Sequence, residues 1–219
     1  MNSLECSAVI LDVDGTLVDS TPAVERIWRA WAAEYGIEVE TVLRSAHGRR
    51  SEDTIREVLA PDEVDRAVRR QETLELEDLG DITAMPGAHE LVAQLAGHVR
   101  LRWALATSLN ARLLNARMAA ADLPLAQAVV TSDVVVHGKP DPECYLLAAR
   151  QLRVPADDCV VIEDAPAGVI AGKAAGATVI AVTHTFPAEI LAAQADFVID
   201  SLLQLRVTDR GLIILPTGD

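Results

Sequence analysis

The chain has 219 residues, of which 50% are hydrophobic and 3% aromatic, and its formal net charge is −14 at pH 7. This length suits one large α/β domain or a core domain with a smaller insert. The negative charge argues against a nucleic-acid or anionic-membrane partner, because such proteins normally present a basic surface. An acidic protein that binds an anionic phosphate needs a local positive field, which a metal ion and a few Lys or Arg side chains at the binding site can provide.

Short apolar runs bounded by polar residues recur along the chain, as is typical of strands buried on both faces of a parallel sheet. They are residues 8–11, 103–106, 128–130, 159–162, 179–182 and 197–199. Between them lie Ala- and Leu-rich segments with helical spacing, at residues 87–96, 110–121, 142–152 and 165–175. This alternation predicts an α/β fold with a doubly wound parallel sheet.

The segment from residue 21 to 83 interrupts the alternation with successive amphipathic helices, predicted at residues 23–35, 51–60 and 61–79. Trp28 and Trp31 lie three residues apart on the first, which indicates core packing. We therefore predict a Rossmann-like core of residues 1–19 and 84–219 with an inserted helical domain of residues 20–83. Asp19 and Ser20 would form its hinge, and residues 205–216 predict a short hairpin.

The three cysteines, Cys6, Cys144 and Cys159, are odd in number and widely spaced, which predicts reduced thiols rather than disulfides or a metal site. The N-terminus lacks a signal-peptide pattern, and no apolar run reaches the ~18 residues of a membrane span. We therefore expect a cytoplasmic protein. The oligomeric state stays open, with a monomer favoured.

Two carboxylates, Asp12 and Asp14, follow the first predicted strand in the motif Asp12-Val13-Asp14-Gly15-Thr16. Other polar residues follow later strands, namely Thr107, Ser108, Lys139, Glu163 and Asp164. Parallel strands would bring them together at one edge, where open α/β sheets bind ligands. Carboxylate oxygens are typical ligands of Mg²⁺. A nucleophile held in position beside a cation favours phosphoryl transfer, because that reaction depends mainly on positioning and on stabilising negative charge.

These motifs, with a helical insert directly after the first, resemble the haloacid dehalogenase superfamily of phosphohydrolases over essentially the whole chain. The most specific segments are residues 138–143 and 163–168, which read Gly-Lys-Pro-Asp-Pro-Glu and Glu-Asp-Ala-Pro-Ala-Gly. The resemblance implies a HAD-like Rossmannoid core with a mobile helical cap that closes over the site.

The resemblance implies that Asp12 attacks phosphorus to form an aspartyl-phosphate, and that Asp14 protonates the leaving oxygen and later activates water. It implies that Mg²⁺ is held by Asp12, by Asp164 and by the backbone carbonyl of Asp14, with Glu163 as a direct or water-mediated ligand. It implies that Thr107 and Lys139 hold the phosphoryl oxygens, and Ser108 is predicted to be a further substrate-binding residue. Taken singly, each of these could be an ordinary loop or helix-cap residue.

A candidate for substrate binding in the insert is His47-Gly48-Arg49-Arg50-Ser51, which places two cations before a predicted helix. Arg49, Arg50 and His47 are predicted to contact substrate, although the choice between the arginines stays open. The alternative is that both arginines are solvated charges at a helix start, where the helix dipole disfavours cations.

Residues 22–28, 47–49, 82–87 and 103–108 resemble a narrower, β-phosphoglucomutase-like group. That group includes bacterial sugar phosphatases and yeast-type glycerol-phosphate and 2-deoxyglucose-6-phosphate phosphatases. The implied partner is therefore a small phosphorylated metabolite, such as a hexose, 2-deoxyhexose, hexitol or glycerol phosphate. Leu109-Asn110 departs from the group, which commonly has Gly there, and this leaves the substrate open.

The same motifs leave two other functions open. A sugar phosphomutase would share all four motifs and could bind a second phosphate through residues such as Arg49, Arg50, Ser108 and Asn110. A phospho-acceptor signalling domain would keep the phosphorylated Asp12 for a partner. The second carboxylate, Asp14, argues against signalling because it favours rapid hydrolysis.

Overall fold

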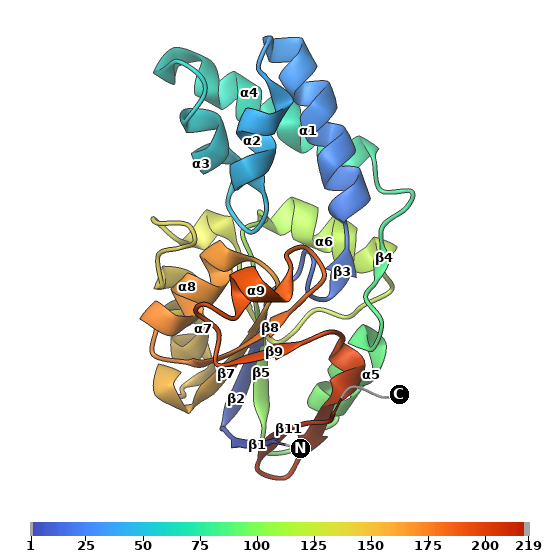
Figure 1. Cartoon of the computed structure of the whole chain (residues 1–219), viewed down its shortest axis with the longest axis vertical. Helices are drawn as coiled ribbons and strands as arrows, with labels where there is room; N and C mark the ends of the chain where they lie inside the picture. The colour runs from blue at the N-terminus through green and yellow to red at the C-terminus, as the bar shows by residue number, and fades with distance from the viewer. Residues whose placement is uncertain (1, 217–219) are drawn as a thin grey trace.

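The computed structural model describes residues 2–216 and consists of a parallel sheet flanked by helices, with a bundle of further helices at one end (Figure 1). The six strands lie in the order β6-β5-β2-β7-β8-β9. They are β2 (Ala8–Leu11), β5 (Arg102–Ala106), β6 (Ala128–Val130), β7 (Cys159–Glu163), β8 (Thr178–Val182) and β9 (Phe197–Ile199). Every predicted strand matches within one residue at each end, and the α/β fold is confirmed.

Helices cover both faces of this sheet because successive strand side chains point to opposite sides. Leu11 and Leu105 pack in one apolar cluster with helices α5 (Ala88–Ala96) and α6 (Ala111–Ala120). Ile10 and Ala104 pack in a second cluster with α7 (Glu143–Leu152) and α8 (Pro166–Ala174). The chain builds the sheet outward in both directions from β2, so the carboxyl end of β2 lies at the crevice where such sheets bind ligands.

The segment of residues 20–83, called the helical insert below, leaves and rejoins the sheet through two antiparallel strands, β3 (Val18–Asp19) and β4 (Thr83–Ala84). It contains α1 (Thr21–Tyr35), α2 (Val39–Ala46), α3 (Ser51–Arg56) and α4 (Pro61–Glu77). These helices share their own apolar cluster, in which Trp28 and Trp31 are buried with ring centroids 5.3 Å apart. The predicted packing role of both residues is confirmed.

Several elements differ from the sequence-based expectation, among them the short strands β3 and β4 and the helix α9 (Ala188–Leu191), which were not predicted. Helix α2 was not predicted either. The helix expected at residues 51–60 ends at Arg56, and Ala60 has extended backbone, as a residue directly before proline prefers. The strand β1 (Asn2–Glu5) was also missed; it joins the predicted tail hairpin, β10 (Leu205–Thr208) and β11 (Gly211–Ile214), in a three-stranded antiparallel sheet.

Shorter helical segments complete the described chain: α9 (Ala188–Leu191) and three 3₁₀ turns at Ser132–Val134, Ala156–Asp158 and Leu202–Gln204. Among the described residues, no helix combines the length and the apolar character that a membrane crossing requires. Cys6, Cys144 and Cys159 are free, as predicted.

Candidate active site

Asp12 lies directly after β2, at the carboxyl end of the central strand, and only 4% of its surface is exposed. Lys139 Nζ donates to Asp12 Oδ1 at 2.6 Å and to Glu163 Oε1 at 2.7 Å. Lys139 is itself 2% exposed. The fold thus brings Lys139 into contact with two carboxylates that lie 127 and 24 residues away from it in the sequence.

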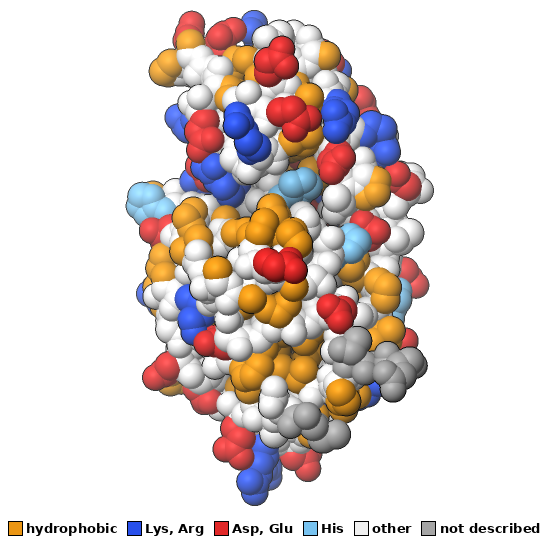
Figure 2. All heavy atoms as spheres, viewed as in Figure 1, with side chains coloured by type: hydrophobic (Ala, Val, Ile, Leu, Met, Phe, Trp, Pro, Cys, Tyr) orange, Lys and Arg blue, Asp and Glu red, His pale blue; other side chains and the backbone are white. Residues whose placement is uncertain are grey.

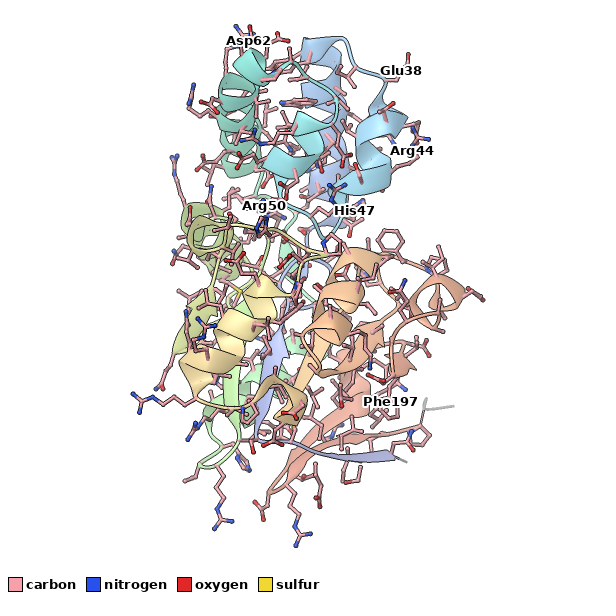
Figure 3. The ribbon with its side chains drawn as sticks, turned by 90° about the vertical axis from the view of Figure 1, so that its left-hand side faces the viewer. Glu38, Arg44, His47, Arg50, Asp62 and Phe197 are labelled. Carbon is pink, nitrogen blue, oxygen red and sulfur yellow. The ribbon has the colours of Figure 1, made fainter. Side chains whose placement is uncertain are left out.

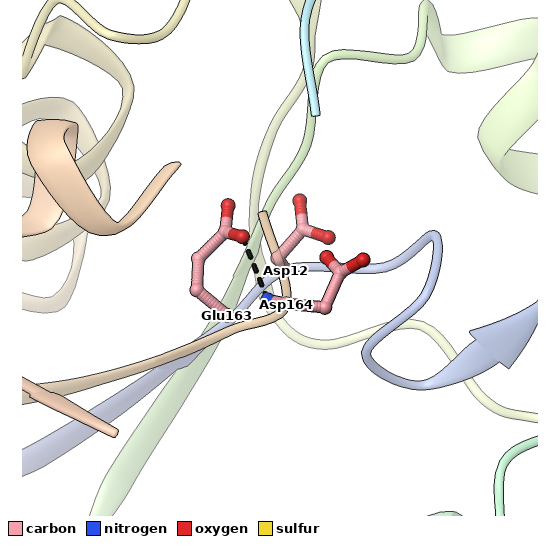
Figure 4. Close-up of side chains that lie close together, drawn as sticks. All are labelled: Asp12, Glu163 and Asp164. Atoms are coloured by element: carbon pink, nitrogen blue, oxygen red, sulfur yellow. Dashed lines mark hydrogen bonds between the residues drawn. The ribbon is translucent and has the colours of Figure 1, made fainter. Parts of the chain in front are cut away.

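Three carboxylates form a buried cluster at this position (Figure 4). One oxygen from each of Asp12, Glu163 and Asp164 lies within 4.8 Å of the others. Glu163 is held firmly, because its Oε2 accepts from the backbone N–H of Asp164 at 2.8 Å and its Oε1 accepts from the Tyr145 hydroxyl at 2.8 Å. A Cβ at Gly168 would lie 1.6 Å from Glu163 Oε1, so a glycine is needed beside this carboxylate.

The charges in this cluster are not balanced, because Lys139 is one cation beside three carboxylates. Burial raises the pKa of Asp12 to about 8; the Lys139 ammonium opposes this shift and the Glu163 carboxylate adds to it. Burial, followed by the charges of Glu163 and Asp12, also raises the pKa of Asp164 well above its usual range. Three buried oxygen ligands with surplus negative charge fit a hard divalent cation.

Asp14, two residues further on, lies outside this cluster of side chains. Its Oδ1 accepts hydrogen bonds from Ser20 Oγ and from Arg117 Nη1, both at 2.9 Å. Arg117 Nη2 in turn donates to Glu75 Oε2 at 3.0 Å. The side chain of Asp14 is 27% exposed and lines the pocket, so Asp12 and Asp14 have different surroundings although both follow β2.

Thr107 and Ser108 follow β5 and line the same pocket as Asp12. Thr107 Oγ1 accepts from the backbone N–H of Leu109 at 3.2 Å, which fixes the hydroxyl in the loop. Ser108 Oγ donates to the carbonyl of Gly48 at 3.0 Å, and this bond joins the sheet to the helical insert. The expected grouping of Thr107 and Ser108 with Asp12 is therefore observed, and their role toward a ligand stays a prediction.

His47 and Arg50 lie at the end of the insert that faces the sheet, as Figure 3 shows. Arg50 makes two hydrogen bonds to Asp53, at 2.7 and 2.8 Å. Arg49 pairs with Glu57 at 2.7 Å. Burial lowers the pKa of His47, which favours the neutral ring. All three line the pocket, but both arginines already have carboxylate partners within the insert.

A pocket of about 310 Å³ lies between the helical insert and the sheet edge. Asp12, Asp14 and Asp164 line its sheet side, while Trp28 and Val68 contribute apolar surface from the insert. Figure 2 shows basic side chains and a histidine along the boundary between these two parts. The pocket is therefore large enough for a small phosphorylated metabolite, and both the sheet edge and the insert contribute polar groups to it.

Three buried polar residues at this site were not predicted from the sequence: Arg117, Glu75 and Tyr145. Each lies on the largely apolar buried face of its helix. Arg117 shares the buried face of α6 with Leu113 and Leu114, and Glu75 continues the buried stripe of α4. A charge at helical spacing on an apolar face is a usable signal for a buried polar network.

The family model of haloacid dehalogenase-like hydrolases matches residues 6–176. The chain is 41% identical over 219 residues to hexitol phosphatase A of Escherichia coli (strain K12), across 99% of this chain and 98% of that protein. It is 32% identical over 216 residues to glycerol-1-phosphate phosphohydrolase 1 of Saccharomyces cerevisiae, across 94% and 86% of the two chains. The crystal structure of a hydrolase from Pseudomonas syringae aligns with a TM-score of 0.83 at 26% identity, covering 90% and 94% of the chains. As its motifs predicted, the chain belongs to the haloacid dehalogenase-like hydrolase family.

Proposed function

We propose that this protein is a Mg²⁺-dependent phosphomonoesterase that hydrolyses a sugar or polyol phosphate through an aspartyl-phosphate on Asp12. The observation that carries the proposal is the position of Asp12: it is buried at the end of the central strand, contacts Lys139, and lies in a carboxylate cluster at the base of the pocket. The similarity to a hexitol phosphatase and a glycerol-1-phosphate phosphohydrolase supports the substrate class.

In the proposed first step, a carboxylate oxygen of Asp12 forms a bond to phosphorus while the bond from phosphorus to the ester oxygen breaks. Asp14 gives its proton to that leaving oxygen. Water then attacks phosphorus, Asp14 takes up the proton, and Asp12 is released with inorganic phosphate. Thr107, Ser108 and Lys139 would hold the phosphoryl oxygens, and the ammonium of Lys139 would offset the charge that they carry.

Asp12, Asp164 and the backbone carbonyl of Asp14 are the proposed Mg²⁺ ligands, with Glu163 beside them. A bound Mg²⁺ supplies the positive charge that lets an ionised carboxylate approach an anionic phosphate. The raised pKa of Asp12 supports this role, because burial shifts it to about 8 when no metal is bound. Asp12 would otherwise carry a proton over much of the neutral range and be a poor nucleophile.

Hydrolysis is favoured over a mutase reaction by the state of the cations that line the pocket. A mutase that uses a sugar bisphosphate has to bind a second phosphate at the far end of the sugar. Arg49 is paired with Glu57, and Arg50 with Asp53, so the charge of each guanidinium is already offset by a carboxylate that a second phosphate would have to displace in part. A neutral hydroxylated leaving group would not require that exchange.

We also propose that residues 20–83 form a cap domain and that residues 1–19 and 84–219 form the catalytic core. The insert has its own apolar cluster, and its two chain connections run through the short pair β3 and β4. Such an arrangement allows the insert to move as a unit about this pair and to exclude water when it closes.

The test is phosphate release from a panel of hexose, 2-deoxyhexose, hexitol and glycerol phosphates with Mg²⁺. Asp12→Asn and a chelator should each abolish release, while Asp157→Asn, which changes an exposed carboxylate before β7, should leave it intact. Phosphate release that survives in Asp12→Asn would refute the nucleophile. Isomerised sugar phosphate that forms only with a bisphosphate activator would instead identify a mutase.

A further inference from the structure

The guanidinium of Arg117 lies between two carboxylates that come from different parts of the molecule. Nη1 donates to Asp14 Oδ1 at 2.9 Å, and Nη2 donates to Glu75 Oε2 at 3.0 Å. Arg117 belongs to α6 of the sheet-flanking layer, whereas Glu75 lies near the end of α4 in the helical insert. The Arg117 side chain is 1% exposed, so this bridge is protected from solvent.

Asp14 has a second link to the insert through Ser20. Ser20 Oγ donates to the same Oδ1 atom of Asp14 at 2.9 Å, and Ser20 directly precedes the first helix of the insert. Glu75 is held from its other side, where Gln71 Nε2 donates to Oε1 at 3.3 Å. The Asp14 carboxylate is therefore tied to the segment that enters the insert and, through Arg117, to α4.

We propose that Arg117 is a positioning residue that aligns the Asp14 carboxylate and, through Glu75, makes this alignment depend on the position of α4. The inference rests on the proposed function, in which Asp14 transfers protons to the leaving oxygen and from water. It assigns α4 a role in proton transfer in addition to closing the pocket.

Arginine suits this task because its planar fork presents two donors in fixed directions, which a lysine cannot do. Among the described residues, the Arg117 Nε atom has no hydrogen-bond partner, so the group is held through its two terminal nitrogens. If α4 moved away, Arg117 would lose one of its two charged partners in a buried site, which is unfavourable. The contact with Glu75 therefore favours the arrangement in which α4 lies against α6 and Arg117 faces Asp14.

The chain contains a matched control between the same two helices. Nη1 of Arg112 on α6 lies 3.6 Å from Oε1 of Glu72 on α4, but the Arg112 side chain is 74% exposed. Exposed pairs of this kind contribute little because water screens them. Arg112→Met thus removes a charge from the same helix and the same interface without disturbing the buried bridge to Asp14.

The experiment compares Arg117→Met with Arg112→Met on two substrates, an alkyl phosphate from the active panel and p-nitrophenyl phosphate. An alkyl leaving group needs a proton from Asp14, whereas nitrophenolate leaves without one. We expect Arg117→Met to lower kcat for the alkyl phosphate by about 100-fold with little change in KM. With p-nitrophenyl phosphate, we expect a burst of nitrophenolate at close to the wild-type rate, followed by slow turnover, because water attack still needs Asp14.

Two milder variants keep the test decisive if Arg117→Met does not fold. Glu75→Gln preserves the size of the side chain but removes its charge, and Arg117→Lys preserves a single donor toward Asp14. Both should show the same dependence on leaving group with a smaller loss in kcat. Arg112→Met should match the wild type on both substrates.

The positioning role would be overturned if Arg117→Met slowed the burst of nitrophenolate as much as it slowed release of the alkyl leaving group. It would also be overturned if folded Arg117 and Glu75 variants kept the wild-type kcat on the alkyl phosphate. Failure of the proposed function looks different: the wild-type protein would then release no phosphate, or Asp12→Asn would remain active. The wild type and Asp12→Asn are therefore measured alongside every variant.

Discussion

Replacing Asp164 by asparagine removes one charge from the buried carboxylate cluster and keeps the size of the side chain. Oxygens of Asp12, Glu163 and Asp164 lie within 4.8 Å of one another. Lys139 donates to the first two of these residues, whereas Asp164 Oδ1 accepts a hydrogen bond from Thr16 Oγ1 at 3.3 Å. Among the residues that the structure describes, no cation is therefore bonded directly to Asp164, and we expect removal of its charge to stabilise the metal-free fold.

The size of the effect follows from Coulomb's law. Two like charges 4.8 Å apart repel by about 3.5 kcal/mol at an effective dielectric constant of ~20. Lys139 offsets part of this repulsion and partial protonation relieves more, so we expect metal-free Asp164→Asn to gain about 1–3 kcal/mol in free energy of unfolding. For a chain of this length, that gain raises Tm by roughly 2–12 °C.

The pH dependence has a defined sign. The folded pKa of Asp164 is raised by burial and by the neighbouring carboxylates, so the folded protein holds a proton that the unfolded chain has released. The stability of the wild type should then fall as pH rises above the ordinary aspartate pKa, and the advantage of Asp164→Asn should grow with pH until the folded carboxyl has also ionised.

The assay is thermal unfolding followed by circular dichroism, with a chelator and then with excess Mg²⁺. A Mg²⁺ concentration of 100 times Kd would add about 2.7 kcal/mol to the free energy of unfolding of the wild type. The free energy of unfolding of Asp164→Asn should rise much less. Asp157→Asn serves as the control for removing a carboxylate elsewhere. A metal-free Asp164→Asn protein that is no more stable than the wild type would refute the view that this cluster is an unbalanced cation site.

Three further outcomes are expected. Gly168→Ala should destabilise the protein by about 1–3 kcal/mol in chemical denaturation and weaken Mg²⁺ binding in titration, because its Cβ would lie 1.6 Å from Glu163 Oε1. Gly80→Ala should be neutral in both experiments, because a Cβ at Gly80 would meet no described atom within 4 Å. Trp31→Ala should cost about 3–5 kcal/mol in chemical denaturation, since Trp31 is fully buried in the insert, and a loss below 1 kcal/mol would contradict that packing. Mg²⁺ affinity, measured by calorimetry, should weaken as pH falls below about 8, where Asp12 gains a proton that competes with the metal; an affinity that does not change with pH would argue against Asp12 as a ligand.

The central sheet could be predicted from sequence because its signal is local. A strand buried on both faces is apolar throughout, so β2 and β7 stand out without knowledge of their partners. Once the strands are known to be parallel, their carboxyl ends fall on one edge, and the meeting of Asp12, Lys139 and Glu163 follows from topology. The charged centre of the site was therefore predictable at the level of residues.

The missed elements depend on distant partners. Strand β1 reads Asn-Ser-Leu-Glu and is largely exposed, and it is defined by pairing with β11, about 200 residues away. The helical spacing of Arg117 and Glu75 can indicate that each is buried, but nothing local indicates that α4 and α6 face each other. Their contact arises from the way the insert packs on the sheet-flanking layer, which no motif encodes.

Asp12 and Asp14 leave the same strand two residues apart, yet different cations hold them. Asp12 is buried, bonded to Lys139 and surrounded by carboxylates, which suits a nucleophile whose ionisation is set by a metal. Asp14 lines the pocket and is bonded to Arg117 and Ser20, which suits a group that must reach a leaving oxygen and water. Such separation of two neighbouring carboxylates by their surroundings is how one site assigns them different tasks. Lys139 belongs to the sheet edge, whereas Arg117 also contacts the insert. Under the proposed mechanism, movement of the insert would therefore alter proton transfer at Asp14 and leave Asp12, the proposed nucleophile, in place.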